Sequence, residues 1–412
     1  MKKRLLIISS GNRIYREYAL RSIATHYDLM MLHDEPLTWQ EPYLIDFKQI
    51  DITDKEKVLA AARALAQRHQ IAGILTYDEP SLEVTAAAAE NLQLRHHCPA
   101  SARLCRDKFA MRQTWDRAGV PSARSRLVFS LQEAGEAANQ IGYPVVLKPR
   151  SMAASIGVIR ADSPEQLTRA YAVASLELHP VFRGSAVGTL VEEYLVGPEI
   201  SVESVVVDGQ VSSIAITRKQ LGLAPHFEEV GHVVSPGEPL GEEAAIREVV
   251  AAAHRAFNIQ YGVTHAELRL TERGPRMIEL NGRSAGDLIP YLVYLATGID
   301  LPLASAQVAV GDPPTLSATH YTTAAIQFIY PTFDGYFREC IIDTTAFQHS
   351  WIEKIVCQRQ PGEELYLPPR GFIPRLGFVI VTGTSMAECA ERIEHARSYV
   401  HIAMEPLIPQ EV

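Results

Sequence analysis

The sequence predicts an α/β fold in the N-terminal part of the chain and α+β structure in the rest. Over about the first 95 residues, short apolar runs alternate with segments of helical periodicity, which is typical of a doubly wound parallel sheet. Further along, residues 190–206 and 265–287 each consist of two alternating apolar and polar runs joined by turn residues. Such pairs predict antiparallel strands.

The composition is that of a globular chain with ordinary buried cores. The 412 residues are 47% hydrophobic and 21% charged, and a chain of this length is expected to form two to four domains. The net charge of -9 and the pI near 5.9 argue against a surface that binds nucleic acid or an anionic membrane. We therefore expect small-molecule partners, and a homodimer is left open.

Hydropathy and cysteine usage predict a cytoplasmic protein. Residues 1–10 combine basic residues with an apolar run that is too short for a signal peptide, so we expect a buried strand there. No apolar run approaches the roughly 18 residues of a spanning helix. The five cysteines, at positions 98, 105, 340, 357 and 389, show neither paired metal spacing nor a disulfide framework, and we expect them to be reduced.

The N-terminal elements place two loops at a possible ligand edge. Residues 4–10 form an apolar strand that ends at Gly11, and helical periodicity follows. Loops at the carboxyl ends of parallel strands usually form the ligand edge of such a sheet. Residues 11–13 and 78–80 are therefore candidates to face a substrate, although an acidic pair after a strand is also typical of a helix cap.

Two lysines are candidate phosphate ligands. A single helix is predicted between residues 98 and 121, and Lys108 lies on its polar side, where a lysine is more often only solvated. Lys148 ends an apolar strand and precedes a loop of small residues at 151–157. Small side chains let backbone N–H groups approach phosphate oxygens, and a buried ammonium needs an anion. An edge-strand lysine that reaches water is the alternative.

Residues 190–206 are a candidate nucleotide segment. They predict two strands joined by a turn at Gly197, the second of which carries Glu199. Backbone groups of residues 192–195 could pair with a purine edge, and Glu199 could accept from ribose hydroxyls. A surface hairpin accounts for the same charges.

Residues 216–237 predict a long loop over a substrate. The segment contains His226, Glu228, Glu229 and His232. Two histidines six residues apart without a third ligand are a weak indication of zinc, and a structural histidine is an equal alternative to a catalytic one.

Residues 265–287 predict a β-hairpin that carries the chemistry. The hairpin sets Glu267 opposite Glu279, and Asn281 and Arg283 follow Glu279 on the same face. Two facing carboxylates repel unless a cation lies between them. Two carboxylates and an amide suit Mg²⁺ or Mn²⁺ better than zinc. A hairpin with a solvated charged face is the alternative reading.

The order of these segments resembles that of the ATP-grasp superfamily over about residues 1–300. The resemblance implies an N-terminal Rossmann-like domain at 1–97 and an ATP-grasp domain at 98–319 with a mobile lid at about 122–190. The ATP-grasp domain would contain a central antiparallel sheet. A small α+β domain at 320–412 would follow, and its strands and helix are predicted from the alternation beyond residue 320.

The resemblance also implies roles for these residues, with ATP and Mg²⁺ or Mn²⁺ as cofactors. The nucleotide would contact Lys108, Lys148, Ser151, Ser155, Glu192, Glu193, Leu195 and Glu199. The metal would be held by Glu267, Glu279 and Asn281. Lys148, Arg283 and His232 would be catalytic, with Arg283 at the acyl-phosphate centre.

Within the superfamily, the chain resembles the L-amino-acid ligase group of carboxylate-amine ligases. The segment HFEEVGHVVSPG looks like the substrate loop of that group. The substrate residues implied are Glu228, His232, Arg283, Gly286 and Asp287, with Asp287 or Glu228 holding an α-ammonium. We expect amide formation between a carboxylate and an amine, on amino acids. Biotin-carboxylase-like or purine-pathway activities and a non-catalytic ATP-binding protein remain alternatives.

Overall fold

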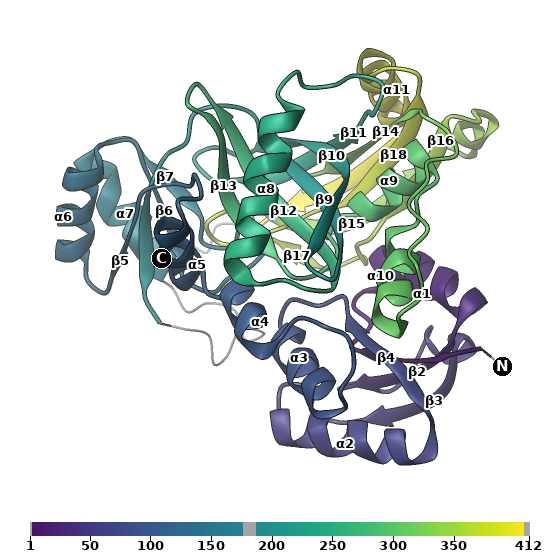
Figure 1. Cartoon of the computed structure of the whole chain (residues 1–412). Helices are drawn as coiled ribbons and strands as arrows, with labels where there is room; N and C mark the ends of the chain where they lie inside the picture. Colours follow the sequence, from purple (N-terminus) through teal and green to yellow (C-terminus); the bar gives the residue numbers. More distant parts are fainter. Residues whose placement is uncertain (1, 176–186, 408–412) are drawn as a thin grey trace.

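Four β-sheets organise the chain in the computed structural model, which describes residues 2–175 and 187–407 (Figure 1). The expected lid and C-terminal domain each include residues outside these ranges, at 176–186 and 408–412. A parallel sheet at the N-terminus and antiparallel sheets elsewhere confirm the predicted fold class.

The N-terminal sheet is parallel and has the strand order β3-β2-β1-β4. Its elements are β1 (Arg4–Ile8), α1 (Arg13–His26), β2 (Asp28–His33), the 3-10 helix η1 (Glu41–Tyr43), β3 (Leu44–Gln49), α2 (Lys55–Arg68), β4 (Ile71–Thr76) and α3 (Leu82–Asn91). In β1, Leu5 and Ile7 pack under α1, while Leu6 and Ile8 pack under α2 and α3. Burial on both faces explains why the strand is a continuous apolar run.

The single helix expected between residues 98 and 121 is wrong, because the chain forms two helices there. These are α4 (Pro99–Arg106) and α5 (Lys108–Ala118). Asp107 ends the first helix and caps the second, since its carboxylate accepts from the N–H groups of Phe109 and Ala110. The break makes Lys108 the first residue of α5, with a buried side chain.

The segment expected to form the lid folds as its own antiparallel sheet, with the order β5-β8-β6-β7. Its elements are β5 (Ser125–Val128), α6 (Leu131–Ile141), β6 (Val145–Pro149), β7 (Ile159–Ala161), α7 (Pro164–Ser175) and β8 (Thr189–Glu193). Alanines of α6 and α7 pack with β6 and β8 in a core of its own.

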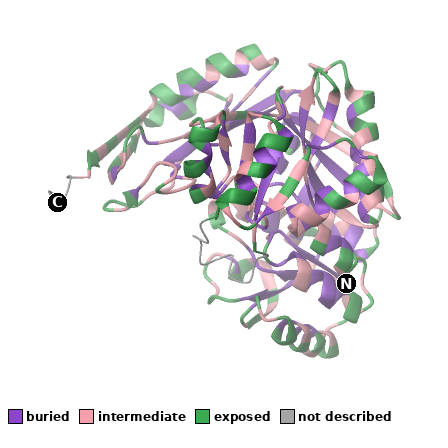
Figure 2. Ribbon diagram, turned by 90° about the vertical axis from the view of Figure 1, so that its left-hand side faces the viewer, coloured by how far each residue is buried: buried purple, intermediate pink, exposed green. Residues whose placement is uncertain are grey.

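The central sheet has eight antiparallel strands in the order β13-β12-β9-β10-β11-β14-β18-β16. Its first five strands are β9 (Glu199–Val207), β10 (Gln210–Gly222), β11 (Glu228–Val234), β12 (Gly262–Thr271) and β13 (Gly274–Asn281). Helices α4, α5 and α8 (Glu243–Phe257) cover one face, while α9 (Ile289–Thr297) and α10 (Leu301–Val310) cover the other. Figure 2 shows buried residues concentrated in the strands between these helices.

The long loop expected at 216–237 is wrong, because β10 and β11 occupy most of that range. Only residues 223–227 connect the two strands. The strand pattern was obscured because Lys219 and Glu229 are charged residues that form an ion pair inside the protein. Their polarity made two half-buried strands look like a solvated loop.

The C-terminal region differs from the separate domain that was expected. Its strands β14 (Thr323–Ile329), β16 (Ile352–Cys357) and β18 (Gly377–Gly383) continue the central sheet, with α11 (Met386–Ser398) packed on them. Three other strands, β15 (Gly335–Ile342), β17 (Glu364–Leu365) and β19 (Val400–Pro406), form a small sheet of their own. The short 3-10 helix η3 (Thr344–Gln348) lies between β15 and β16.

The expectation of unpaired cysteines is wrong for Cys340 and Cys357, which form a disulfide between β15 and β16, whereas Cys98, Cys105 and Cys389 are free.

Among the described residues, no single helix has the length and apolarity to cross a membrane. Helices α9 and α10 have the required length and apolarity only when they are taken together, and the pair is bent by 101°.

Candidate active site

One cavity brings together nearly all the predicted site residues. It has a volume of about 230 Å³ and lies between the sheet of β5, β8, β6 and β7, the central sheet and the C-terminal loop that contains Ile373 and Arg375. All the predicted site residues except Ser151 and His232 line it. Ser151 is buried at the start of the loop after β6, and His232 is fully buried in β11.

The hairpin of β12 and β13 has the predicted pairing. Glu267 is the register partner of Glu279, and His265 is the partner of Asn281. The register shifts directly after Glu267, and the pairing continues from Leu268 with Met277. Both carboxylates line the cavity, so the two acidic side chains face the same space.

Each of the two facing carboxylates binds a lysine from another element. Lys108 Nζ lies 3.0 Å from Glu279 Oε1 and also donates to the Met152 carbonyl oxygen at 2.6 Å. Lys219 Nζ lies 2.7 Å from Glu267 Oε1. The two carboxylates thus already attract cations, and with the Asn281 amide they offer the hard oxygen donors that Mg²⁺ or Mn²⁺ prefers. The residues present fit the predicted metal.

Lys148 has the anion that its burial requires. Its Nζ lies 2.5 Å from Glu192 Oε2, and Glu192 also pairs with Arg112 at 2.9 Å. All three side chains are nearly inaccessible. Burial lowers the pKa of Lys148 despite the attraction of Glu192. Glu192 was expected only at a nucleotide base, and the structure shows that its carboxylate pairs with two cations that also line the cavity.

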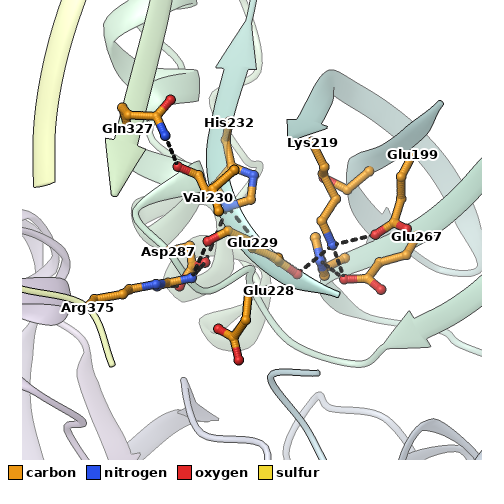
Figure 3. A network of polar contacts seen from close by, with 12 residues as sticks. Glu199, Lys219, Glu228, Glu229, Val230, His232, Glu267, Asp287, Gln327 and Arg375 are labelled. Atoms are coloured by element: carbon orange, nitrogen blue, oxygen red, sulfur yellow. Dashed lines mark hydrogen bonds and ion pairs between the residues drawn. The ribbon is translucent and has the colours of Figure 1, made fainter. Parts of the chain in front are cut away.

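Lys219 is the centre of a buried network that the sequence interpretation missed (Figure 3). Its ammonium contacts Glu229 at 2.7 Å and Glu199 at 3.2 Å in addition to Glu267. Burial disfavours its charge, but the three carboxylates outweigh burial and hold the pKa of Lys219 well above its usual value. One lysine therefore connects the predicted ribose residue Glu199, the predicted metal ligand Glu267 and Glu229 of β11.

His265 forms a hydrogen bond with the Glu267 carboxylate and orients it. Its Nδ1 lies 2.8 Å from Glu203 Oε1, and its Nε2 lies 3.1 Å from Glu267 Oε1. Burial opposes protonation, but the two carboxylates raise the pKa of His265 to about 10. The ring is thus a charged bridge that orients the Glu267 carboxylate.

The predicted substrate residues His232 and Asp287 belong to one ion network, in which Asp287 lines the cavity and His232 does not. His232 Nε2 lies 3.1 Å from Glu229 and 3.2 Å from Asp287. Arg375 donates to both Asp287 oxygens, at 2.7 and 2.6 Å. Burial disfavours the Asp287 charge, but Arg375 and His232 hold the pKa of Asp287 well below its usual range. Glu229, His232 and Asp287 each have one atom that could coordinate a metal, and these atoms lie within 4.8 Å of one another. Lys219 and Arg375 already pair with the two carboxylates, so the cluster needs no metal ion to balance its charge.

The N-terminal domain contributes Glu79 to the site. Arg283 Nη2 lies 2.6 Å from Glu79 Oε2. With its amide nitrogen turned toward Glu79, Asn281 donates to both carboxylate oxygens, at 2.9 and 3.3 Å. Residues 78–80 were one of the two loops expected at the ligand edge, and Glu79 reaches the segment that follows the hairpin.

Arg375 and Lys219 are site residues that the sequence analysis did not single out. Lys219 shares one strand face with Ala215, Thr217 and Leu221, so a strand interpretation of 210–222 would have placed its side chain among small and apolar neighbours. Arg375 comes from a C-terminal segment with no regular structure, and nothing in the local sequence indicates that it reaches Asp287.

Comparisons with known proteins agree with this arrangement. The ATP-grasp domain model matches residues 141–290, and the ATP-grasp N-terminal domain model matches residues 17–96. The chain is 27% identical over 410 residues to the uncharacterized protein y4rH of Sinorhizobium fredii, covering 98% of this chain and 84% of that protein. It is 30% identical over 259 residues to the alanine–anticapsin ligase of Bacillus subtilis, covering 57% of this chain and 53% of the ligase. The chain therefore spans about half the length of that ligase.

Among solved structures, the L-amino acid ligase from Bacillus licheniformis is similar over nearly its whole length. The TM-score is 0.83 at 22% sequence identity, and the match covers 98% of this chain and 99% of that one. At this identity the likeness establishes a shared fold.

Proposed function

This chain belongs to the ATP-grasp superfamily, and from that premise we propose that it is an ATP-dependent carboxylate-amine ligase that acts on amino acids and releases ADP and phosphate. The observation that carries the proposal is the pairing of Glu267 with Glu279 across the hairpin, in one cavity with Lys108 and Lys148. The amino-acid ligases among the similar proteins support the substrate class.

The first step needs a carboxylate to become an electrophile. A terminal phosphoryl group moves from ATP to a carboxylate oxygen of the substrate, which breaks the bond to ADP and forms an acyl phosphate. Lys108 and Lys148 would bind nucleotide phosphates, and Arg283 would neutralise charge at the acyl-phosphate centre. Glu267, Glu279 and Asn281 would hold Mg²⁺ or Mn²⁺, which when bound neutralises charge on the phosphate oxygens.

The second step is attack of an amine on the acyl phosphate. The nitrogen forms a bond to the acyl carbon and loses a proton, and inorganic phosphate leaves. No side chain of the protein becomes covalently attached in this scheme. Residues 151–157 lie over the cavity through Ala153, Ala154 and Ser155, and closure of this loop would exclude water that hydrolyses the acyl phosphate.

The contacts proposed for the base and the ribose of the nucleotide follow from the ion pairs of the cavity. Backbone groups near Glu193 and Leu195 would meet the base, because Glu192 is committed to Lys148 and Arg112. Glu199 would accept from ribose hydroxyls with its orientation fixed by Arg269 at 3.0 Å and Lys219 at 3.2 Å. We propose that His232 positions Glu229 and Asp287 and does not itself touch the substrate.

The test is a screen for phosphate release with the twenty amino acids, singly and in pairs, in the presence of ATP and Mg²⁺. We expect ADP and phosphate to form when a carboxylate and an amine are both present, with the amide product detected by mass spectrometry. Pyrophosphate and AMP as products would contradict the acyl-phosphate route. Release that requires bicarbonate with biotin, or formate with a purine precursor, would contradict the amino-acid assignment.

A further inference from the structure

Among the described residues, Glu228 is the only cavity carboxylate without a cationic side chain within 4.0 Å. Every other carboxylate that lines the cavity pairs with a lysine, an arginine or a histidine. These are Glu192, Glu193, Glu199, Glu229, Glu267, Glu279 and Asp287. Glu228 therefore stands out in a site where negative charge is otherwise balanced.

The contacts of Glu228 are hydrogen bonds from neutral groups. The Tyr330 hydroxyl donates to Oε2 at 3.0 Å, and the Ile373 N–H donates to Oε1 at 3.3 Å. Arg375 donates to the Tyr330 hydroxyl from Nε at 3.1 Å, and its charge lowers the pKa of Glu228 by less than burial raises it. In Figure 3 the Glu228 carboxylate points away from the network of Glu229, Asp287 and Arg375.

The Glu228 carboxylate has no counter-ion among the described side chains of the protein, and a positively charged ligand can supply one. The residue is only 2% exposed, and burial raises the pKa of Glu228. An ionised carboxylate can accept about four hydrogen bonds, and two donors leave part of that capacity unused. A buried charge without a partner is costly, and a ligand ammonium would remove that cost. Phe227 and Ile373 line the same part of the cavity and offer apolar contact to the carbon chain that carries such a group.

We propose that Glu228 binds a primary ammonium group of the substrate. The inference deepens and rests on the proposed function, because it takes the ligand to be the amino-acid or amine substrate. Asp287, the other residue expected to hold an ammonium, is already bound by Arg375 and His232. The ammonium could be the α-amino group of the activated amino acid or a terminal amino group on a longer side chain. Both have the same chemistry, and matched ligands separate them.

The experiment measures binding by isothermal titration calorimetry, with Mg²⁺ and a non-hydrolysable ATP analogue present. Lysine and norleucine differ at the terminal ammonium, while alanine and propionate differ at the α-ammonium. The wild-type protein is expected to bind the ammonium member of one pair about 10- to 100-fold more tightly than its match. Glu228→Gln keeps acceptor and donor groups for Ile373 and Tyr330 but lacks the charge, so it should lose most of that preference.

Two further variants separate charge from packing. Tyr330→Phe removes the hydroxyl but leaves the Glu228 charge, so the preference for the ammonium member should remain. Glu272→Gln, at the exposed hairpin turn, is the matched control for loss of one negative charge. A preference that survives in Glu228→Gln, or its absence from the wild-type protein in both pairs, overturns the inference.

Phosphate release with the same four compounds and an added amine distinguishes this inference from the proposed reaction. Binding that depends on Glu228 without any phosphate release would reject the ligase activity and keep the ammonium site. Phosphate release with equal use of both members of each pair would keep the ligase and reject the ammonium site.

Discussion

Lys219 Nζ lies 2.7 Å from Glu267 Oε1, so one of the two carboxylates proposed to hold the metal already carries a buried ammonium. The same ammonium contacts Glu229 and Glu199. A single ammonium thus contacts three carboxylates from three strands of the central sheet, and Arg269, His232 and His265 each pair with one of them as well. We infer that Lys219 holds these groups in place before the nucleotide and the metal arrive.

Replacement of Lys219 by Met should therefore destabilise the protein as well as reduce activity. The substitution leaves Glu199, Glu229 and Glu267 without their shared cation, and removal of one partner of a buried ion pair costs about 3–5 kcal/mol. The free energy of unfolding from urea titration measures this loss. Lys55→Met, on an exposed helix position, is the control and should change it little. Equal stability of the two variants would contradict the structural role of Lys219.

Glu279→Gln and Asn281→Ala should each reduce ATP turnover while the fold is retained. Both side chains lie at the cavity and not in a hydrophobic core. We expect a decrease on the order of 100-fold or more, because a bound metal contributes several kcal/mol of charge stabilisation. Phosphate release as a function of Mg²⁺ concentration is the measurement, and Glu272→Gln on the same hairpin is the control. Retained activity with an unchanged Mg²⁺ dependence would reject the metal site.

The sequence predicted the parts of the site that depend on local pattern. Alternation within 265–287 was sufficient to place Glu267 opposite Glu279, because a hairpin aligns residues that are close in the chain. The strands that contain Lys219 and Glu229 were misread, because charged side chains that are neutralised inside a protein look like solvated ones in a sequence. Arg375 and Glu79 reach the site from distant segments, and their contacts depend on tertiary packing that no local pattern encodes.

Lys148→Ala should weaken nucleotide binding as well as turnover, because a phosphate ligand acts in both the ground state and the transition state. We expect about a 10- to 100-fold increase in the dissociation constant of ADP with Mg²⁺, measured by calorimetry. Glu192 keeps Arg112 as a partner in this variant, so the carboxylate is not left unpaired. Lys57→Ala, which removes an exposed lysine, should bind ADP normally. Unchanged affinity in Lys148→Ala would reject the role of Lys148 in phosphate binding.

His254 should make stability depend on pH below neutrality. Burial lowers the pKa of His254 to about 4 in the folded protein, from an unfolded value near 6.5. The unfolded chain therefore binds the extra proton first as the pH falls, and stability that is present above pH 6.5 is lost toward pH 4. We expect about 2 kcal/mol of this loss between pH 7 and pH 5.

His254→Gln tests that assignment through the slope of the unfolding free energy against pH. The variant lacks the titrating group, so its slope between pH 7 and pH 5 should be smaller than that of the wild-type protein, whatever its stability at pH 7. His401→Asn changes an exposed histidine and should leave the wild-type slope intact. Identical slopes in all three proteins would contradict the prediction.

Glu79→Gln should impair catalysis through Arg283, although Glu79 belongs to the N-terminal domain. Arg283 lies 2.6 Å from Glu79, and the carboxylate raises the pKa of the buried guanidinium against the effect of burial. A neutral amide keeps the size of the side chain but frees Arg283 and the Asn281 amide to move. We expect kcat for phosphate release to fall about 10- to 100-fold, as for other residues that orient ligands from a second layer. Glu83→Gln, at a half-buried position of α3, is the control in the same domain. A normal kcat in Glu79→Gln would show that the N-terminal domain supports the fold of the site without orienting its reacting groups.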